Sequence, residues 1–176
     1  EGLSKLIIED HILICGWNSV APELIYTLTS SDSPERKKVV VIEDFEVKKP
    51  LEQYGFDRKL VFYCRGKSTD FYTLEKASAS DAKAAIVLAK KGAQNSRNEE
   101  GILTNLAIRE YFKKNLKDEK HIHVSSELKY QENIEHFKKS GSSSIINTSL
   151  LINNLIGLAC ISPNIINFIL NILTYD

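Results

Sequence analysis

The sequence predicts an α/β protein, in which a doubly wound parallel sheet of about six strands is followed by a C-terminal helical hairpin for dimerisation. Two observations lead to this prediction. Short apolar runs alternate with stretches of helical period, which is the pattern of a mostly parallel sheet with crossover helices. From Ser142 to the end, the only charged side chain is that of Asp176, while leucine and isoleucine crowd together. So much apolar surface has to be covered by another surface.

The apolar runs give the candidate strands, and their number is that of a Rossmann fold. They are His11 to Cys15, Val39 to Glu43, Leu60 to Cys64, Ala84 to Ala89, His121 to Ser125 and Ser144 to Asn147. Between the first two runs, apolar residues at helical spacing predict a helix with Ser19 as its N-cap. Later helices are predicted at Phe71 to Ala77, Ile102 to Leu116 and Glu132 to Lys139. The polar segment Lys90 to Asn98 is predicted as a mobile loop at the carboxyl end of the fourth strand.

The apolar tail is interpreted as two helices joined at Ser162-Pro163. A membrane-spanning helix needs roughly 18 or more largely uninterrupted apolar residues, and Asn153, Asn154 and Pro163 interrupt the tail. An interface with another subunit is therefore favoured, while a hairpin folded back on its own sheet remains the alternative. The predicted interface residues are Leu151, Leu155, Ile156, Ile165, Ile169 and Leu173.

Composition limits the functional classes. The 176 residues include 23 basic and 23 acidic side chains, so the chain has no electrostatic footprint for nucleic acid. Its 3 cysteines are widely spaced, which argues against a disulfide framework and fits a reducing cytosol. The chain opens with Glu1 and has no initiator Met, so we interpret it as part of a larger protein whose membrane segment lies elsewhere.

The first strand leads into a turn where a dinucleotide-binding protein would read G-x-G-x-x-G, and only the first glycine is present. Asn18 replaces the second glycine and would crowd a pyrophosphate, which disfavours NAD. A smaller anion or an adenine nucleotide could still bind, or the turn could simply pack. Polar residues after the next two strands join the predicted ligand site. The full set is Gly16, Trp17, Asn18, Ser19, Glu43, Asp44, Arg65 and Lys67.

Acidic residues near helix starts and strand ends offer a second kind of site. Glu99, Glu100 and Glu127 supply the hard oxygen ligands that a divalent cation such as calcium prefers. Each of them is also ordinary for an exposed helix surface. Neither a Ser-His-Asp nor a Cys-His arrangement is found at recognisable spacing, so no catalytic residue is predicted and an enzyme is not expected.

Several segments carry a resemblance to a known family. The opening strand and turn read His11-Ile-Leu-Ile-Cys-Gly-Trp17, and later segments read Leu74-Glu-Lys-Ala77, Asp81-Ala-Lys-Ala-Ala-Ile-Val87, Glu132-Asn-Ile-Glu135 and Lys139-Ser-Gly141. Together they resemble RCK domains, the regulators of potassium conductance of prokaryotic potassium channels, in which a C-G-W turn replaces the glycine-rich one. The resemblance implies a Rossmann-like lobe and a helix-turn-helix crossover that exchanges between subunits. Where calcium-sensing members of the family have an acidic residue, this chain has Asn98. Where nucleotide-binding members have an acidic residue, it has Lys67.

The resemblance implies a ligand-sensing gating domain on the cytoplasmic side of the cell membrane. Its expected partners are further copies of itself, as a dimer or a tetrameric or octameric ring, and the membrane pore module that conducts potassium. The expected organisation is a linker from an upstream pore region (1–9), a Rossmann-like lobe (10–148) and a dimerisation segment (149–176). A regulatory subunit of a potassium uptake transporter and a fragment of an NAD-dependent oxidoreductase remain alternatives.

Overall fold

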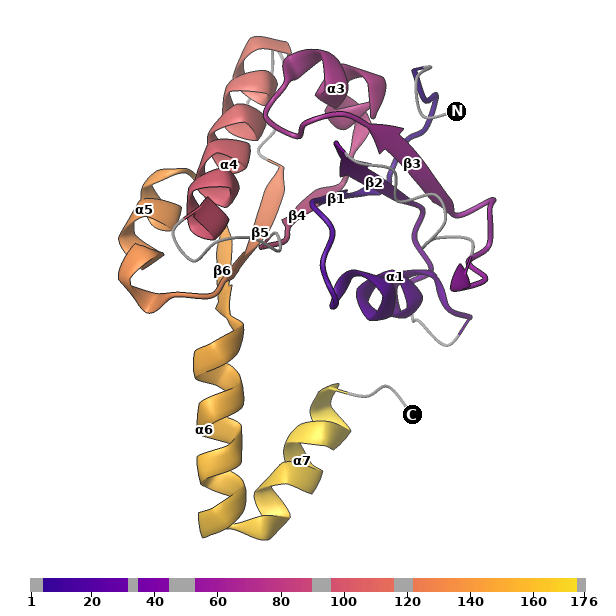
Figure 1. Ribbon diagram of the computed structural model, residues 1–176. Helices are drawn as coiled ribbons and strands as arrows, with labels where there is room; N and C mark the ends of the chain where they lie inside the picture. Colours follow the sequence, from indigo (N-terminus) through magenta and orange to yellow (C-terminus); the bar gives the residue numbers. More distant parts are fainter. Residues whose placement is uncertain (1–4, 32–34, 45–52, 90–95, 116–121, 174–176) are drawn as a thin grey trace.

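The computed structural model describes residues 5–31, 35–44, 53–89, 96–115 and 122–173. They contain a six-stranded parallel sheet in the order β3-β2-β1-β4-β5-β6 (Figure 1). The strands are β1 (Ile12–Cys15), β2 (Val39–Glu43), β3 (Val61–Arg65), β4 (Ala84–Val87), β5 (His123–Leu128) and β6 (Ser144–Asn147). The predicted fold class, an α/β doubly wound parallel sheet of Rossmann type, is confirmed.

Two apolar layers hold helices against the two faces of the sheet. On one face, α1 (Ala21–Thr29) packs through Ile25 against Ile14 and Val41. On the other, α3 (Phe71–Lys76) and α4 (Ser96–Asn115) pack through Leu74 and Ile108. Side chains alternate between faces along each strand. Because helices cover both faces, β2 can be apolar at four successive positions and buried throughout.

Strand β5 and helix α4 differ from the sequence prediction at polar residues; in addition, β4 ends two residues earlier than expected, and the helix predicted from Glu132 begins at Ile134. Strand β5 begins two residues later than expected and continues to Leu128, because Ser126 and Glu127 are buried and hydrogen-bonded. Helix α4 begins at Ser96, so the predicted loop is wrong for residues 96–98, and residues 90–95 lie outside the described part. Polar residues suit a helix start, where the first backbone N–H groups lack partners within the helix.

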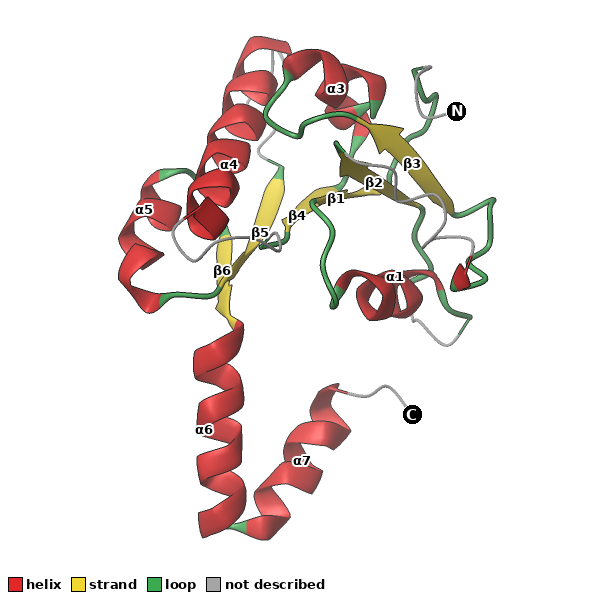
Figure 2. Cartoon of the chain, in the orientation of Figure 1, coloured by secondary structure: helices red, strands yellow, loops and turns green. Residues whose placement is uncertain are grey.

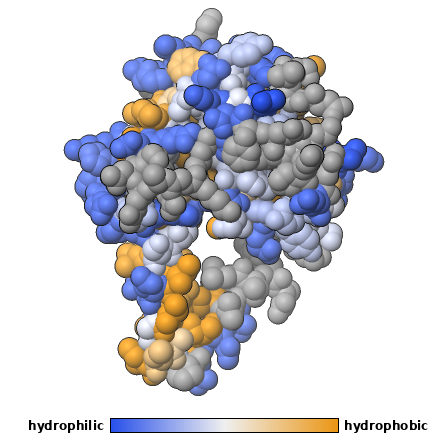
Figure 3. All heavy atoms as spheres, in the orientation of Figure 1, coloured by the Kyte–Doolittle hydropathy of each residue, from blue (hydrophilic) through white to orange (hydrophobic). Residues whose placement is uncertain are grey.

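Helices α5 (Ile134–Lys139) and α4 lie on the same face of the sheet, whereas α6 (Thr148–Ile161) leaves the sheet entirely. Helix α7 (Pro163–Leu173) follows a bend at Ser162 and packs back against α6 (Figure 2). Figure 3 shows apolar residues gathered over this hairpin. None of the helices in the described part is both long and apolar enough to cross a membrane.

The predicted interface residues all belong to this hairpin. Leu151 and Ile156 are exposed, at 52% and 61%, while Leu155, Ile165 and Ile169 are partly buried. The side chain of Leu173 lies outside the described residues. No residue of α6 is buried. Within the described chain, the hairpin is therefore not folded onto the sheet, which was the alternative to an interface.

Candidate ligand crevice

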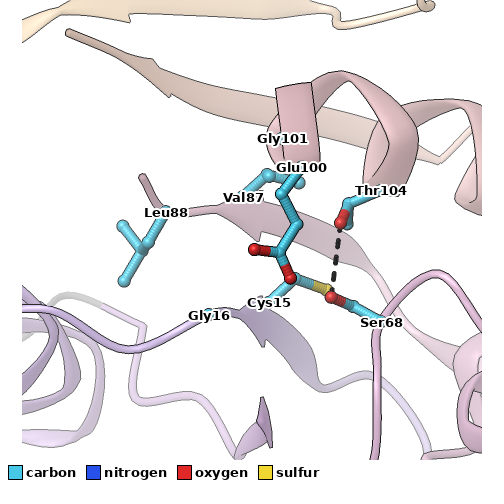
Figure 4. Close-up of a pocket in the computed structure, with 8 residues that line it drawn as sticks. All are labelled: Cys15, Gly16, Ser68, Val87, Leu88, Glu100, Gly101 and Thr104. Atoms are coloured by element: carbon cyan, nitrogen blue, oxygen red, sulfur yellow. Dashed lines mark hydrogen bonds between the residues drawn. The ribbon is translucent and has the colours of Figure 1, made fainter. Parts of the chain in front are cut away.

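The order of strands reverses between β1 and β4, and this is where open α/β sheets bind ligands beyond the carboxyl ends of their strands. A small pocket, partly open to solvent, lies at this position (Figure 4). It is lined by Cys15, Gly16, Ser68, Val87, Leu88, Glu100, Gly101 and Thr104. The hydroxyls of Ser68 and Thr104 share a hydrogen bond of 3.3 Å on one side of it.

Gly16 directly follows the first strand and has a conformation that other residues rarely adopt, with φ of 98°. A Cβ atom at this position would lie 3.0 Å from the backbone oxygen of Leu88. The glycine therefore allows the β1–α1 turn to approach the end of β4 closely. This is the one glycine of the dinucleotide pattern that the chain retains, and it forms part of the pocket wall.

Asn18, at the position of the second glycine, is buried at 3% exposure. Its side-chain nitrogen donates to the backbone oxygen of Ala89 and to Oε2 of Glu127, both at 2.8 Å. Its side-chain oxygen accepts from the backbone N–H of Val20 at 2.9 Å, in place of the cap predicted for Ser19. The predicted Ser19 cap is wrong, because helix α1 starts at Ala21 after Val20, without a side-chain cap from its N-cap residue.

Glu127 completes this arrangement from β5 and is also buried, at 8% exposure. Oε2 of its carboxylate accepts from Asn18 and from the backbone N–H of Ala89, at 2.8 and 3.0 Å. Oε1 accepts from the hydroxyl of Thr148, the first residue of α6, at 3.4 Å. Among the described residues, no Lys or Arg forms an ion pair with Glu127. One carboxylate thus contacts the first turn, the end of β4 and the start of the hairpin.

The remaining predicted ligand residues lie beside the pocket but do not line it. Trp17 is partly buried against the apolar layer of α1, and Ser19 is exposed. Glu43 is buried and pairs in register with the exposed Arg65 across β2 and β3. Asp44 and Lys67 are exposed, and the Asp44 backbone N–H donates to Oε1 of Glu43 at 2.8 Å. The carboxyl edge of the sheet therefore carries these residues, while only Gly16 of the predicted set forms the pocket wall.

The predicted metal ligands are not gathered into one site. Glu99 is exposed at the start of α4, Glu100 lines the pocket, and Glu127 is engaged with Asn18. Among the described residues, no three His, Cys, Asp or Glu side chains form a group that could hold a metal ion. The geometry gives this set no support as a joint metal centre.

Sequence reasoning missed several pocket residues because they are small or apolar. Ser68 and Thr104 come from the β3–α3 loop and from α4, and both are buried. Their burial has no signature in a single sequence. Gly101 was a visible signal, since a glycine inside a helix is unfavourable, and here a Cβ would approach the ring of Phe137 at 3.0 Å.

Comparisons with known proteins agree with this architecture. The chain is similar to the TrkA-N domain of the inner membrane protein ybaL from Escherichia coli, with a TM-score of 0.66 and 18% identity, covering 86% of this chain and 96% of that one. It is similar to GsuK bound to ADP, with a TM-score of 0.65 and 16% identity over 89% of this chain. The human SLO3 gating ring gives a TM-score of 0.63 and 14% identity over 87% of this chain.

The chain spans only 36% of the GsuK chain and 26% of the SLO3 chain. No curated protein sequence matches it. The family model of the calcium-activated potassium channel slowpoke-like RCK domain matches residues 7–146, from before β1 to within β6. Since this match covers most of the chain, the protein belongs to the slowpoke-like RCK domain family.

Proposed function

We propose that this chain is the regulatory domain of a potassium channel, located on the cytoplasmic side of the membrane. A ligand bound at the crevice would change the arrangement of neighbouring domains, and that change would act on the pore. The observation that supports the proposal best is the exposed apolar hairpin, which starts directly after β6 and contacts Glu127, beside the crevice, through Thr148. A binding position and an assembly surface are thus directly connected.

The similar proteins support the same assignment. One is a gating ring and another was solved with ADP. For this chain we infer a homo-oligomer, formed through α6 and α7, that can build a larger ring around a pore conducting potassium. A ligand shifts such an assembly only by binding one arrangement more tightly than another, and a coupling of about 1 to 3 kcal/mol is typical. The domain would therefore act without turning over its ligand.

The hairpin surface carries the assembly part of the proposal. Ile156, Ile161 and Phe168 are 61%, 83% and 64% exposed. An isolated domain would leave this contiguous apolar surface in water, which soluble monomers rarely do. A second hairpin of the same kind is the natural cover, because a two-fold interface pairs the same patch on both subunits.

Light scattering of the purified chain tests the assembly part. We expect a dimer for the unmodified chain and a monomer for Ile156→Asp combined with Phe168→Asp, because two charges would have to be buried in an apolar interface. Asn154→Asp is the matched control, since Asn154 is an exposed polar residue of the same helix. Weak association is visible at concentrations on the order of tens of micromolar. If the unmodified chain is a monomer at such a concentration, the result contradicts the proposal.

Potassium flux through the full-length protein in liposomes tests the gating part. The hairpin variants should alter flux or its response to ligand, whereas Asn154→Asp should not. Flux that is the same with and without this domain would exclude a gating role even if the chain dimerises.

One second candidate is the alternative that the sequence left open. In this candidate the chain is a regulatory subunit of a potassium uptake system. The two functions differ in the genetic and physical connection to the membrane protein, because a channel domain is expected to be covalently joined to its pore. Co-purification of a separate membrane protein with the full-length chain would favour the transport subunit.

A further inference from the structure

A buried carboxyl group, that of Glu127, lies beside the crevice, outside the residues that line the pocket. In dinucleotide-binding sheets, the pyrophosphate lies over the first turn, at the N-terminus of the first helix, and the second glycine gives it room. Here Asn18 stands at the sequence position of the second glycine, and its side-chain nitrogen donates to the backbone oxygen of Ala89, two residues after β4. The carboxylate of Glu127 lies directly behind it, 2.8 Å from the Asn18 nitrogen.

The hydrogen bonds of this pair are mutually satisfied. Both ends of the Asn18 amide are used, its nitrogen by two acceptors and its oxygen by the backbone N–H of Val20. Glu127 in turn accepts the backbone N–H of Ala89 at 3.0 Å. A buried carboxylate requires such donors, and they replace the water that it loses on folding.

A ligand phosphate would meet two obstacles at this position. It would need the space of Asn18, whose side chain is buried and fixed at three points. It would also approach the Glu127 carboxylate, which forms no ion pair with a described Lys or Arg. Two like charges repel strongly where water is excluded.

We propose that Glu127 is a specificity-determining and positioning residue: with Asn18, it closes the crevice to diphosphate ligands and ties the closed turn to the start of α6. The second part follows from Oε1, which accepts from the hydroxyl of Thr148 at 3.4 Å. Only the second part of this inference rests on the proposed function. It adds that opening of the crevice would change the start of the hairpin. It narrows the ligand to one without a diphosphate at this turn.

Ligand titration of the isolated chain tests the first part, with ADP and adenosine as probes. The unmodified chain should bind ADP no more tightly than adenosine. Asn18→Gly combined with Glu127→Ala should increase ADP affinity by at least about tenfold, which is a large and measurable change, and should leave adenosine affinity unchanged. The comparison isolates the phosphates because both probes share the nucleoside.

The single variant Glu127→Gln keeps the size of the side chain and removes its charge, so it serves if the double variant fails to fold. It should gain ADP affinity over the unmodified chain, but by less than the double variant, because the Asn18 side chain remains in place. Glu132→Gln is the matched control, since Glu132 is exposed in the short helix after β5. ADP binding to the unmodified chain as tight as to the opened variants would overturn the proposal, and so would variants that fold but gain nothing.

Amide hydrogen exchange tests the second part. Glu127→Ala should speed exchange at the Ala89 amide, which loses its acceptor, and at the first turn of α6. Glu132→Ala should change neither. Exchange at the start of α6 that is unaffected by Glu127→Ala would refute the link to the hairpin. These measurements use the isolated chain and need no pore. The role of Glu127 can therefore be refuted while the gating proposal holds, and the gating proposal can be refuted while the role of Glu127 holds.

Discussion

The Asn18 side-chain nitrogen donates to Oε2 of Glu127 at 2.8 Å, although the two residues are 109 positions apart in the chain. The contact joins the first turn to the fifth strand. It also joins the feature that departs most clearly from dinucleotide-binding proteins to the helical hairpin that we assign to assembly. Its energetic importance can be measured directly.

Replacing Asn18 by Asp should destabilise the chain by about 2 to 4 kcal/mol at neutral pH, because two donors are lost and two carboxylates meet in a buried position. Urea unfolding of the variant and of the unmodified chain at neutral pH gives the comparison. Asn153→Asp, on the exposed face of α6, should cost little, and an equal cost at both sites would contradict the prediction.

His11 should make the fold sensitive to mild acid. It is fully buried, and burial lowers the pKa of its imidazole, against the opposing effects of its bond to the Ala77 oxygen and of nearby Asp81 and Asp10; Lys38 lowers the pKa further. Since the pKa is lower in the folded chain, the unfolded chain takes up the proton first as pH falls. The stability is therefore complete above the ordinary value of 6.5 and is lost as pH falls through it.

The corresponding experiment compares unfolding at pH 7.5 and 5.5 for the unmodified chain and for His11→Gln, which keeps a donor for Ala77. We expect the loss of stability between these pH values to be smaller in the variant by on the order of 1 kcal/mol. His136→Gln, an exposed replacement, should retain the full loss. If both variants behave alike, burial of His11 is not the cause.

Gly141 should resist substitution. Its φ is 89°, and a Cβ there would lie 2.8 Å from Cγ of Arg109. Arg109 donates from Nε to the Gly141 oxygen at 2.7 Å and also reaches Ile122 and Ser143, so it cannot easily move away. Gly141→Ala should cost about 1 to 3 kcal/mol.

Gly157 is the natural control, because it lies inside α6, where an added Cβ would meet no described atom within 4 Å. Gly157→Ala should be neutral or should stabilise the helix by about 0.5 to 1 kcal/mol. Urea denaturation of the two variants side by side decides between a positional requirement and a general intolerance of alanine.

Thiol labelling should report on the hairpin. Cys15 and Cys64 are both 1% exposed, and burial raises the pKa of the Cys64 thiol, so neither should react quickly. Cys160 is exposed on α6. We expect one fast-reacting thiol per chain at low concentration, and slower labelling as concentration rises and hairpins pair. Ile156→Asp should remove that concentration dependence; a second fast thiol in the folded chain would contradict the burial pattern.

The sequence by itself determined the class of fold, most element positions and the apolar character of the tail. Runs such as Val39 to Glu43 are buried on both faces of a parallel sheet, and that requirement is visible in a short stretch of sequence. The absence of charge from Ser142 to Tyr175 likewise indicates surface that must be covered. These signals are local, so each can be recognised without knowing which elements lie next to it in the fold.

Only the tertiary structure decided which polar residues meet. In sequence, Glu127 is one acidic residue near a strand end and was predicted as a metal ligand; in the fold, it is buried against Asn18 and Ala89. Ser126 and Asn105 are joined in the same way, by a hydrogen bond between β5 and α4. Contacts between distant segments depend on strand order and register, which place the ends of β1, β4 and β5 at one edge. A single sequence contains no local trace of that placement, because the hydrogen-bond partner of each polar group comes from another part of the chain.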